Sequence, residues 1–228
     1  VGDTGFLKND NFSFKVNDTY KIGDDICHLG IMNKGNIDDQ RDMQLTAEIN
    51  CSKRTSTTLN HTATHLLHKA LKDVLGNHVQ QAGSLVSYDR LRFDLTHYQK
   101  VSNGEIEKIE ENVNKIIRDN IKLSVNNKSF DVAKKEGAEA LFGEKYGDTV
   151  RVVDVKGYSK ELCGGTHVDS TGDIGIFKII SESSLASGVR RIEAMTGSNL
   201  IEKSKDALNK LKKLSEMLNV PNDELETR

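Results

Sequence analysis

The fold is decided by residues 52–75, which read SKRTSTTLNHTATHLLHKALKDVL. Apolar residues recur here at intervals of three and four, the spacing that gathers side chains on one face of an α-helix. Gly76 follows directly, and glycine is the residue that most often ends a helix. We therefore predict a long helix whose apolar face must be covered by other elements. That face comprises Leu59, Ala63, Leu66, Leu67, Ala70, Leu71, Val74 and Leu75.

Short strands and a second helix are predicted on either side of this helix. Residues 12–16, 26–32 and 43–49 are strand-like runs separated by Gly, Asn and Asp, and they predict a small β-barrel or part of one. After the helix, residues 79–86 and 91–95 predict a hairpin. Ser102 and Glu105 then have the spacing of a capping box in front of another helical pattern.

The second half of the chain alternates between helical and strand-like patterns. Asp131 is predicted to cap a shorter helix that reaches about Leu141. Residues 149–155, 174–181 and 189–195 are rich in β-branched side chains and suit an antiparallel sheet. Residues 200–218 predict a Lys-rich helix that ends near Pro221, with a leucine stripe typical of a core contact or a coiled-coil seam. The stripe comprises Leu208, Leu211, Leu214 and Leu218.

The sum is an α+β chain. We predict a partial β-barrel subdomain over residues 1–50 and an antiparallel sheet with packed helices over residues 51–198. A helical linker over residues 199–228 leads toward a further module. The chain begins with Val1 rather than Met, and we expect it to be a fragment of a longer protein.

Composition excludes several classes of protein. The 228 residues are 36% hydrophobic and 29% charged, which argues against a disordered, collagen-like or disulfide-stapled chain. No apolar run approaches the roughly 20 residues that cross a bilayer, and no signal-peptide pattern opens the chain. Cys27, Cys51 and Cys163 lie far apart without CxxC spacing, so a disulfide framework is not expected. We expect a cytoplasmic protein with no membrane partner.

Charge is distributed unevenly along the sequence. The net charge is −2, but residues 1–50 hold five Lys/Arg against nine Asp/Glu, and residues 51–100 hold seven against three. The second block is where a polyanion is predicted to bind, with a solvated surface of mixed charge as the alternative.

Two histidines and a later Cys–His pair form a candidate metal site. His61 and His65 are four residues apart on the predicted helix, so their Cβ atoms lie about 6 Å apart on one face. Cys163 and His167 are also four apart, with Gly164 and Gly165 between them. Three imidazoles and one thiolate are a tetrahedral set suited to zinc. His68 is a competing ligand on the helix, but the sequence offers it no later partner.

Other chemistries for these residues remain open. A zinc peptidase of the HExxH type is disfavoured, because Thr62 and not glutamate follows the first histidine. A hydrolase could instead use Cys163 as a nucleophile activated by His167, with Gly164 and Gly165 as backbone oxyanion donors. Nucleophile and metal ligand are mutually exclusive roles for one sulfur atom.

Five separated motifs resemble the editing domain of alanyl-tRNA synthetase, in that family's order and over nearly the whole chain. They are NHTATHLLH at residues 60–68, QAGSLV at 81–86, LRFD at 91–94, LCGGTH at 162–167 and VRRIEAMTG at 189–197. The opening VGDTG is similar to the segment that follows a Gly-Gly-Gln turn in the same family.

The resemblance implies hydrolysis of the ester in tRNA(Ala) mischarged with serine or glycine. It implies one zinc ion per chain, bound by His61, His65, Cys163 and His167. The catalytic pocket would combine Cys163 with three polar residues and with backbone from two glycines, while five basic residues would contact tRNA. The polar residues are Thr64, Gln81 and Ser84, the glycines are Gly164 and Gly165, and the basic residues are Arg190 and Arg191 first, then Lys53, Arg54 and Arg92.

Three alternatives accompany this interpretation. The chain could be a free-standing trans-editing deacylase, a relative of the threonyl-tRNA synthetase editing module, or a non-catalytic zinc-stabilised RNA-binding module. An editing role would place the fragment in a longer ATP-dependent ligase. Four protein ligands would fill a tetrahedral zinc shell, so one ligand is displaced, the shell expands, or another group handles water.

Overall fold

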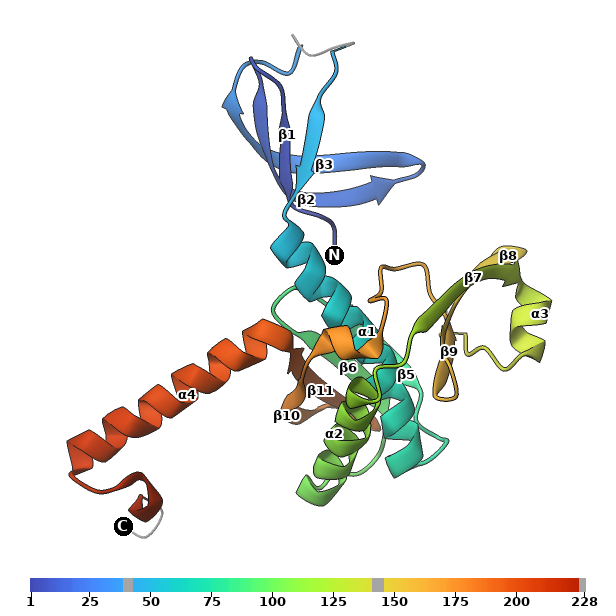
Figure 1. Ribbon diagram of the computed structural model, residues 1–228. Helices are drawn as coiled ribbons and strands as arrows, with labels where there is room; N and C mark the ends of the chain where they lie inside the picture. The colour runs from blue at the N-terminus through green and yellow to red at the C-terminus, as the bar shows by residue number, and fades with distance from the viewer. Residues whose placement is uncertain (39–42, 141–145, 226–228) are drawn as a thin grey trace.

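In the computed structural model, which describes residues 1–38, 43–140 and 146–225, the chain forms three antiparallel sheets and four α-helices (Figure 1). One long helix, α1 (Cys51–Leu75), runs through the centre and connects the N-terminal sheet to the rest of the molecule. Among these residues, no helix is both long and apolar enough to span a membrane. The three sheets and four helices of the described residues confirm the predicted α+β class.

The N-terminal sheet is open in the described residues and not a closed barrel. Its strands are β1 (Gly5–Lys8), β2 (Ser13–Ile22), β3 (Asp25–Lys34) and β4 (Thr46–Ile49), in the order β3-β2-β1-β4. No ladder joins the outer strands β3 and β4 there. The predicted barrel closure is thus not formed, because β1 and β4 have only four residues each and leave most of the long β2–β3 hairpin without a third strand.

Helix α1 begins and ends where the sequence indicates. The side chain of Asn50 accepts a hydrogen bond from the backbone of Lys53 and caps the first turn. Gly76 ends the helix with a φ of 114°, a backbone conformation that residues other than glycine rarely adopt. Its buried face includes Ala63, Leu66 and Leu67, as the periodicity predicted.

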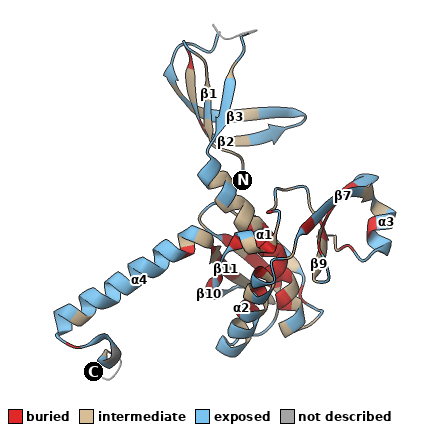
Figure 2. Cartoon of the chain, viewed as in Figure 1, coloured by how far each residue is buried: buried red, intermediate tan, exposed pale blue. Residues whose placement is uncertain are grey.

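The main core lies between α1, α2 (Asn103–Arg118) and a four-stranded sheet. This sheet has the order β10-β11-β6-β5, with β5 (Gln81–Val86), β6 (Leu91–Thr96), β10 (Phe177–Ala186) and β11 (Val189–Thr196). Phe93 from β6 and Phe177 from β10 are fully buried in it. Figure 2 shows that buried residues concentrate around α1. The hairpin and the second helix are confirmed.

A third sheet stands beside this core and carries the segment that leads to Cys163. It consists of β7 (Leu123–Ser129), β8 (Thr149–Val155) and β9 (Ser159–Leu162). The predicted strand at residues 149–155 is confirmed, but it belongs to this sheet and not to the sheet of β10 and β11. The predicted strand at 174–181 starts later, at Phe177, because residues 171–174 form a short 3-10 helix. Strands β1, β7 and β9 were not predicted.

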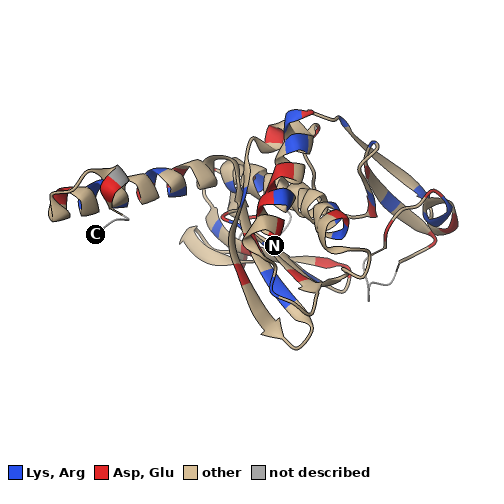
Figure 3. Ribbon diagram, turned by 90° about the horizontal axis from the view of Figure 1, so that it is seen from below, with Lys and Arg blue, Asp and Glu red and all other residues tan. Residues whose placement is uncertain are grey.

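Two helices differ from the prediction in extent or environment. Helix α3 (Phe130–Lys135) is shorter than predicted, and Gly137 follows it with a φ of 82°; the predicted end at Leu141 lies outside the described residues. Helix α4 (Gly197–Leu218) projects away from the core with charges of both signs along it (Figure 3). Its four stripe leucines are exposed, so within this chain the stripe is not a core contact. The coiled-coil alternative stays a prediction.

The capping box of α2 gives a test of this fold. The Ser102 side chain accepts from the backbone of Glu105, whose carboxylate accepts from the backbone and hydroxyl of Ser102. We expect Ser102→Ala to lower the free energy of unfolding by about 1 kcal/mol in urea denaturation. The exposed Ser184→Ala is the control and should have no effect. Hydrogen bonds from Ser102 lower the pKa of Glu105, so this contribution is present above its unfolded pKa and is lost as pH falls through the folded pKa.

Candidate metal centre

Helix α1 places two histidines on the side that faces β9. His61 and His65 are one turn apart, and their ring centroids are 5.3 Å from each other. His61 is half-buried and His65 is buried. The helical spacing alone accounts for this half of the site.

The other half is the loop that follows β9. Cys163 and His167 lie on it, and the guanidinium of Arg151 donates to the carbonyl oxygens of Cys163 at 2.8 Å and Gly165 at 2.6 Å. Gly165 packs directly on the His61 ring: a Cβ atom there would be 2.1 Å from Cε1 of His61. Only glycine allows the loop to approach the helix this closely. A Cβ atom at Gly164, in contrast, would have no neighbour within 4 Å in the described part of the chain.

The four predicted donors converge on one point. The ligand atoms of His61, His65, Cys163 and His167 all lie within 4.8 Å of one another. The sulfur of Cys163 is 3.3 Å from Nε2 of His61 and 3.4 Å from Nε2 of His167. Tetrahedral zinc bonds of 2.0–2.3 Å give ligand separations of about 3.3–3.8 Å, and both of these sulfur–nitrogen distances lie in that range.

Hydrogen bonds at Nδ1 orient each of the three imidazoles. Nδ1 of His61 donates to the carbonyl of Thr166 at 3.2 Å, and Nδ1 of His65 meets a carboxylate oxygen of Glu161 at 2.5 Å. Nδ1 of His167 lies 3.2 Å from the hydroxyl oxygen of Thr62, which itself donates to a backbone carbonyl. Each ring therefore has Nε2 available for the centre, the arrangement by which protein metal sites fix histidine ligands.

The electrostatics favour ligand forms of the cysteine and of one histidine. Burial acts to raise the pKa of Cys163, but hydrogen bonds from His167, His61 and His65 lower it to about 3. Burial lowers the pKa of His167 to about 4, against the opposing effect of Cys163. A thiolate and a neutral imidazole are the forms that bind metals. A Cys–His hydrolase needs one imidazole beside its cysteine, whereas three imidazoles surround Cys163. The arrangement therefore favours a metal site over a nucleophilic cysteine.

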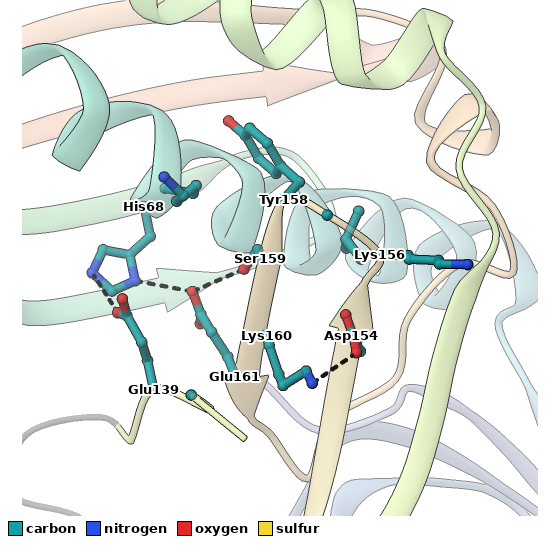
Figure 4. A pocket seen from close by; sticks show the side chains of 12 residues that line it. His68, Glu139, Asp154, Lys156, Tyr158, Ser159, Lys160 and Glu161 are labelled. Carbon is teal, nitrogen blue, oxygen red and sulfur yellow. Dashed lines mark hydrogen bonds and ion pairs between the residues drawn. The ribbon is translucent and has the colours of Figure 1, made fainter. Parts of the chain in front are cut away.

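Glu161 is a functional candidate that was not predicted from the sequence. It is buried, and although burial would raise its pKa, the charge of His65 and the hydrogen bonds of His65 and His68 hold it well below its usual range. Its other oxygen lies 3.0 Å from Nδ1 of His68, and Ser159 approaches the same oxygen (Figure 4). The available signal was its position two residues before Cys163.

His68 does not compete for the four-donor centre. The expectation that it lacks a later partner is wrong, because Glu161 binds its Nδ1. Its Nε2 is buried, has no hydrogen-bond partner among the described residues, and lies 3.9 Å from the Glu139 carboxylate (Figure 4). His68, Glu139 and Glu161 could together hold a second ion, but the ammonium of Lys72 already lies 2.5 Å from Glu139 and opposes a cation.

The described hydrogen bonds of the three predicted pocket residues involve none of the four donors. The hydroxyl of Thr64 is buried and donates to the backbone carbonyl of Asn60. Nε2 of Gln81 is 3.4 Å from the hydroxyl of Ser84, which is exposed. Gln81 lines a cavity of about 350 Å³ with His68, and none of the four donors is among the described residues that line it.

Most of the basic residues predicted to contact tRNA are held in ion pairs. Arg54 binds Asp3, Arg190 lies 2.5 Å from Glu182, and Arg191 lies 2.7 Å from Asp94. Nε of Arg92 is 3.5 Å from the same Asp94. The ammonium of Lys53 differs, because it lies over the Tyr88 ring, 4.7 Å from the centroid.

Comparison with known proteins supports the resemblance found in the sequence. Residues 150–193 match the family described as the threonyl and alanyl tRNA synthetase second additional domain. Alanine–tRNA ligase of Thermoanaerobacter sp. (strain X514) is 50% identical over 225 residues, which is 99% of this chain and 25% of the relative. The enzyme of Fusobacterium nucleatum subsp. nucleatum is 49% identical over 99% of this chain and 26% of its own length. That of Francisella tularensis subsp. mediasiatica is 53% identical over 92% and 24%.

These matches cover nearly all of this chain but only part of each relative. The chain spans about a quarter of the length of each of these relatives. The family match begins in β8 and ends in β11, so it contains Glu161, Cys163 and His167 but not the two histidines of α1.

The contact between Glu161 and His65 can be tested through metal affinity. We expect Glu161→Gln to weaken zinc binding by about 10- to 100-fold in competition with a chromophoric chelator, because the amide holds the His65 ring less firmly. Glu139→Gln is the matched control, since that carboxylate approaches His68 and not a donor of the cluster. Equal affinity of Glu161→Gln and the unmodified protein, both folded by circular dichroism, would contradict this role.

Proposed function

We propose, from the correspondence of this chain to the region of alanine–tRNA ligases that contains the second additional domain, that it hydrolyses tRNA(Ala) mischarged with serine or glycine. The observation that carries the proposal is the convergence of three imidazoles and one thiolate from two segments about 100 residues apart. The ligase activity of the longer relatives stays outside the proposal, since the chain spans about a quarter of them.

The chain's own residues supply the framework for hydrolysis. His61, His65, Cys163 and His167 would hold one zinc ion, which would supply a Lewis acid for the ester carbonyl or for a water molecule if one ligand is displaced or the shell expands. Glu161, Thr62 and the Thr166 carbonyl keep the three rings in the ligating orientation. Residues 51–198 are thereby proposed as the deacylase unit, and residues 1–50 and 199–228 as its flanking parts.

Chemical discrimination explains why a second hydrolytic site is needed. A pocket made for alanine separates glycine from alanine by one methyl group, which is worth only about 1–3 kcal/mol. Serine carries a hydroxyl that alanine lacks, and a site can select it by a hydrogen bond. Gln81 is the residue that we propose for this contact, with Thr64 and Ser84 as secondary candidates, because its long amide can reach into a pocket from strand β5.

The activity is tested by incubating the zinc-loaded chain with tRNA(Ala) charged with radiolabelled serine and measuring the release of serine. We expect the double variant Cys163→Ala, His167→Ala to lose most of its zinc by elemental analysis and to hydrolyse at least about a hundredfold more slowly, because two helical histidines form an incomplete site. Cys51→Ala is the matched control, since Cys51 is exposed and lies outside the donor cluster. A double variant with full zinc would disprove the ligand assignment. Zinc binding without any hydrolysis would favour the non-catalytic RNA-binding module.

Substrate choice gives a separate prediction for Gln81. We expect Gln81→Ala to slow hydrolysis of serine-charged tRNA about tenfold more than hydrolysis of glycine-charged tRNA, because only serine offers the hydroxyl. Gln99→Ala, an exposed glutamine in the β6–α2 connection, serves as control and should leave both rates unchanged. Equal loss on both substrates would assign Gln81 a general role in catalysis or folding.

A further inference from the structure

One buried ring nitrogen outside the four-donor cluster has no hydrogen-bond partner among the described residues. It is Nε2 of His68, which follows His65 by three residues on α1 and has a side chain that is only 6% exposed. This nitrogen lies on the side of the ring that faces the Glu139 carboxylate (Figure 4). Leaving a buried polar atom unpaired is unfavourable, so the position suits a ligand that the described chain does not supply.

Glu161 fixes the His68 ring and leaves Nε2 as an electron-pair donor. An ionised carboxylate only accepts hydrogen bonds, so Nδ1 of His68 donates to the Glu161 oxygen 3.0 Å away. In the neutral ring the proton is then on Nδ1 and the free lone pair is on Nε2. The same carboxylate orients His65 through its other oxygen, at 2.5 Å. A carboxylate at one ring nitrogen is the arrangement by which proteins orient histidine toward a metal at the other nitrogen.

Glu139 provides an oxygen donor beside this nitrogen. Its backbone is anchored to β9, because its amide donates to the carbonyl of Lys160 and its carbonyl accepts from the amide of Leu162, each at 2.9 Å. One of its carboxylate oxygens lies 3.9 Å from Nε2 of His68. Two ligands on one zinc ion are about 3.3–3.6 Å apart at bond lengths of 2.0–2.2 Å, so a small shift of this half-exposed carboxylate completes the pair.

Two cavities meet at His68 and Glu139. One has a volume of about 430 Å³ and is also lined by Glu161, and the other has a volume of about 350 Å³ and is also lined by Lys72. Both volumes exceed what a few water molecules occupy. An ion held by the nitrogen and the carboxylate can therefore reach them from outside and keep water in its remaining coordination positions.

Lys72 is the cation beside Glu139 in this structure. Its ammonium lies 2.5 Å from the carboxylate, and its side chain is 20% exposed. The flexible four-carbon stem of lysine lets the ammonium withdraw into the smaller cavity, which Lys72 itself lines. A partly exposed ion pair of this kind contributes little stability, and it leaves Nε2 of His68 unpaired. Lys72 therefore competes with a metal ion for Glu139 but not for His68.

We propose that His68 and Glu139 form a second metal site, which takes a divalent transition ion such as zinc. The ion binds Nε2 of His68 and the Glu139 carboxylate, water fills its other positions, and Lys72 leaves Glu139 as the ion enters. An imidazole donor suits zinc and related ions, whereas calcium and magnesium prefer oxygen ligands alone. Glu161 lies behind both sites, since it orients His65 for one and His68 for the other. The inference does not depend on the deacylase reaction.

The number of bound ions is tested by equilibrium dialysis of the 228-residue chain against cobalt(II), with bound metal measured by elemental analysis. We expect two ions per chain at saturation, the second bound about a hundredfold or more weakly, because it has two protein ligands and not four. Sulfur-to-cobalt charge-transfer absorption should stop increasing after the first equivalent, since the second site has no thiolate. Saturation at one ion in both the unmodified chain and Lys72→Met would overturn the second site.

The role of Glu139 is tested in the same titration. We expect Glu139→Gln to weaken binding of the second ion at least about tenfold and to leave the first unchanged, because the amide is a poorer ligand than the carboxylate. Glu136→Gln is the matched control, since Glu136 pairs with Lys128 and lies outside the proposed ligand pair. Equal affinity of Glu139→Gln and the unmodified chain for the second ion would place that ion elsewhere and overturn the assignment.

Competition by Lys72 gives a test in which affinity should rise. We expect Lys72→Met to bind the second ion about fivefold more tightly, because the competing ammonium is removed while the stem is kept. Lys69→Met is the matched control on the same helix and should have little effect, since Lys69 pairs with Asp73 and not with Glu139. Weaker or unchanged binding of the second ion by Lys72→Met would contradict the proposed exchange at Glu139.

Discussion

The close approach of the Cys163 loop to helix α1 is the constraint on which the candidate site depends. Two histidines on a helix are common, and they become a metal centre only when a second segment brings donors within about 4 Å. Gly165 makes this approach possible by offering no Cβ to the His61 ring, and Arg151 holds the loop through two carbonyl oxygens. The third sheet therefore acts as the support for a loop whose chemistry is completed on another element.

Glu161 links the third sheet to two histidines of helix α1. Its two carboxylate oxygens contact His65 and His68, so one buried anion orients a donor of the cluster and a histidine outside it. Burying a carboxylate costs several kcal/mol unless charged partners and hydrogen bonds offset the loss of solvation. Both are present here, since the charged His65 lies 2.5 Å from one carboxylate oxygen and Nδ1 of His68 lies 3.0 Å from the other. The helix and the loop are thus coupled by a charged network as well as by the donors.

Local patterns explain which parts of this structure could be predicted from the sequence. The bounds of α1, the capping box at Ser102 and the strand at residues 149–155 depend on periodicity and on neighbours within four residues, and all were predicted. The convergence of the four donors was also predicted, but the resemblance supported it together with the spacing. Strand β9 was missed because its sequence, Ser-Lys-Glu-Leu, is short and mostly polar. The contact of Glu161 with His65 depends on a partner about 100 residues away, which no local pattern encodes.

The distribution of charge in the folded chain could not be predicted from the sequence either. Residues 51–100 carry an excess of positive charge along the sequence, yet five of their seven Lys/Arg side chains form ion pairs in the fold. Some of the acids come from far away, such as Asp3 for Arg54 and Glu139 for Lys72. A basic block in the sequence is therefore not a basic patch in space.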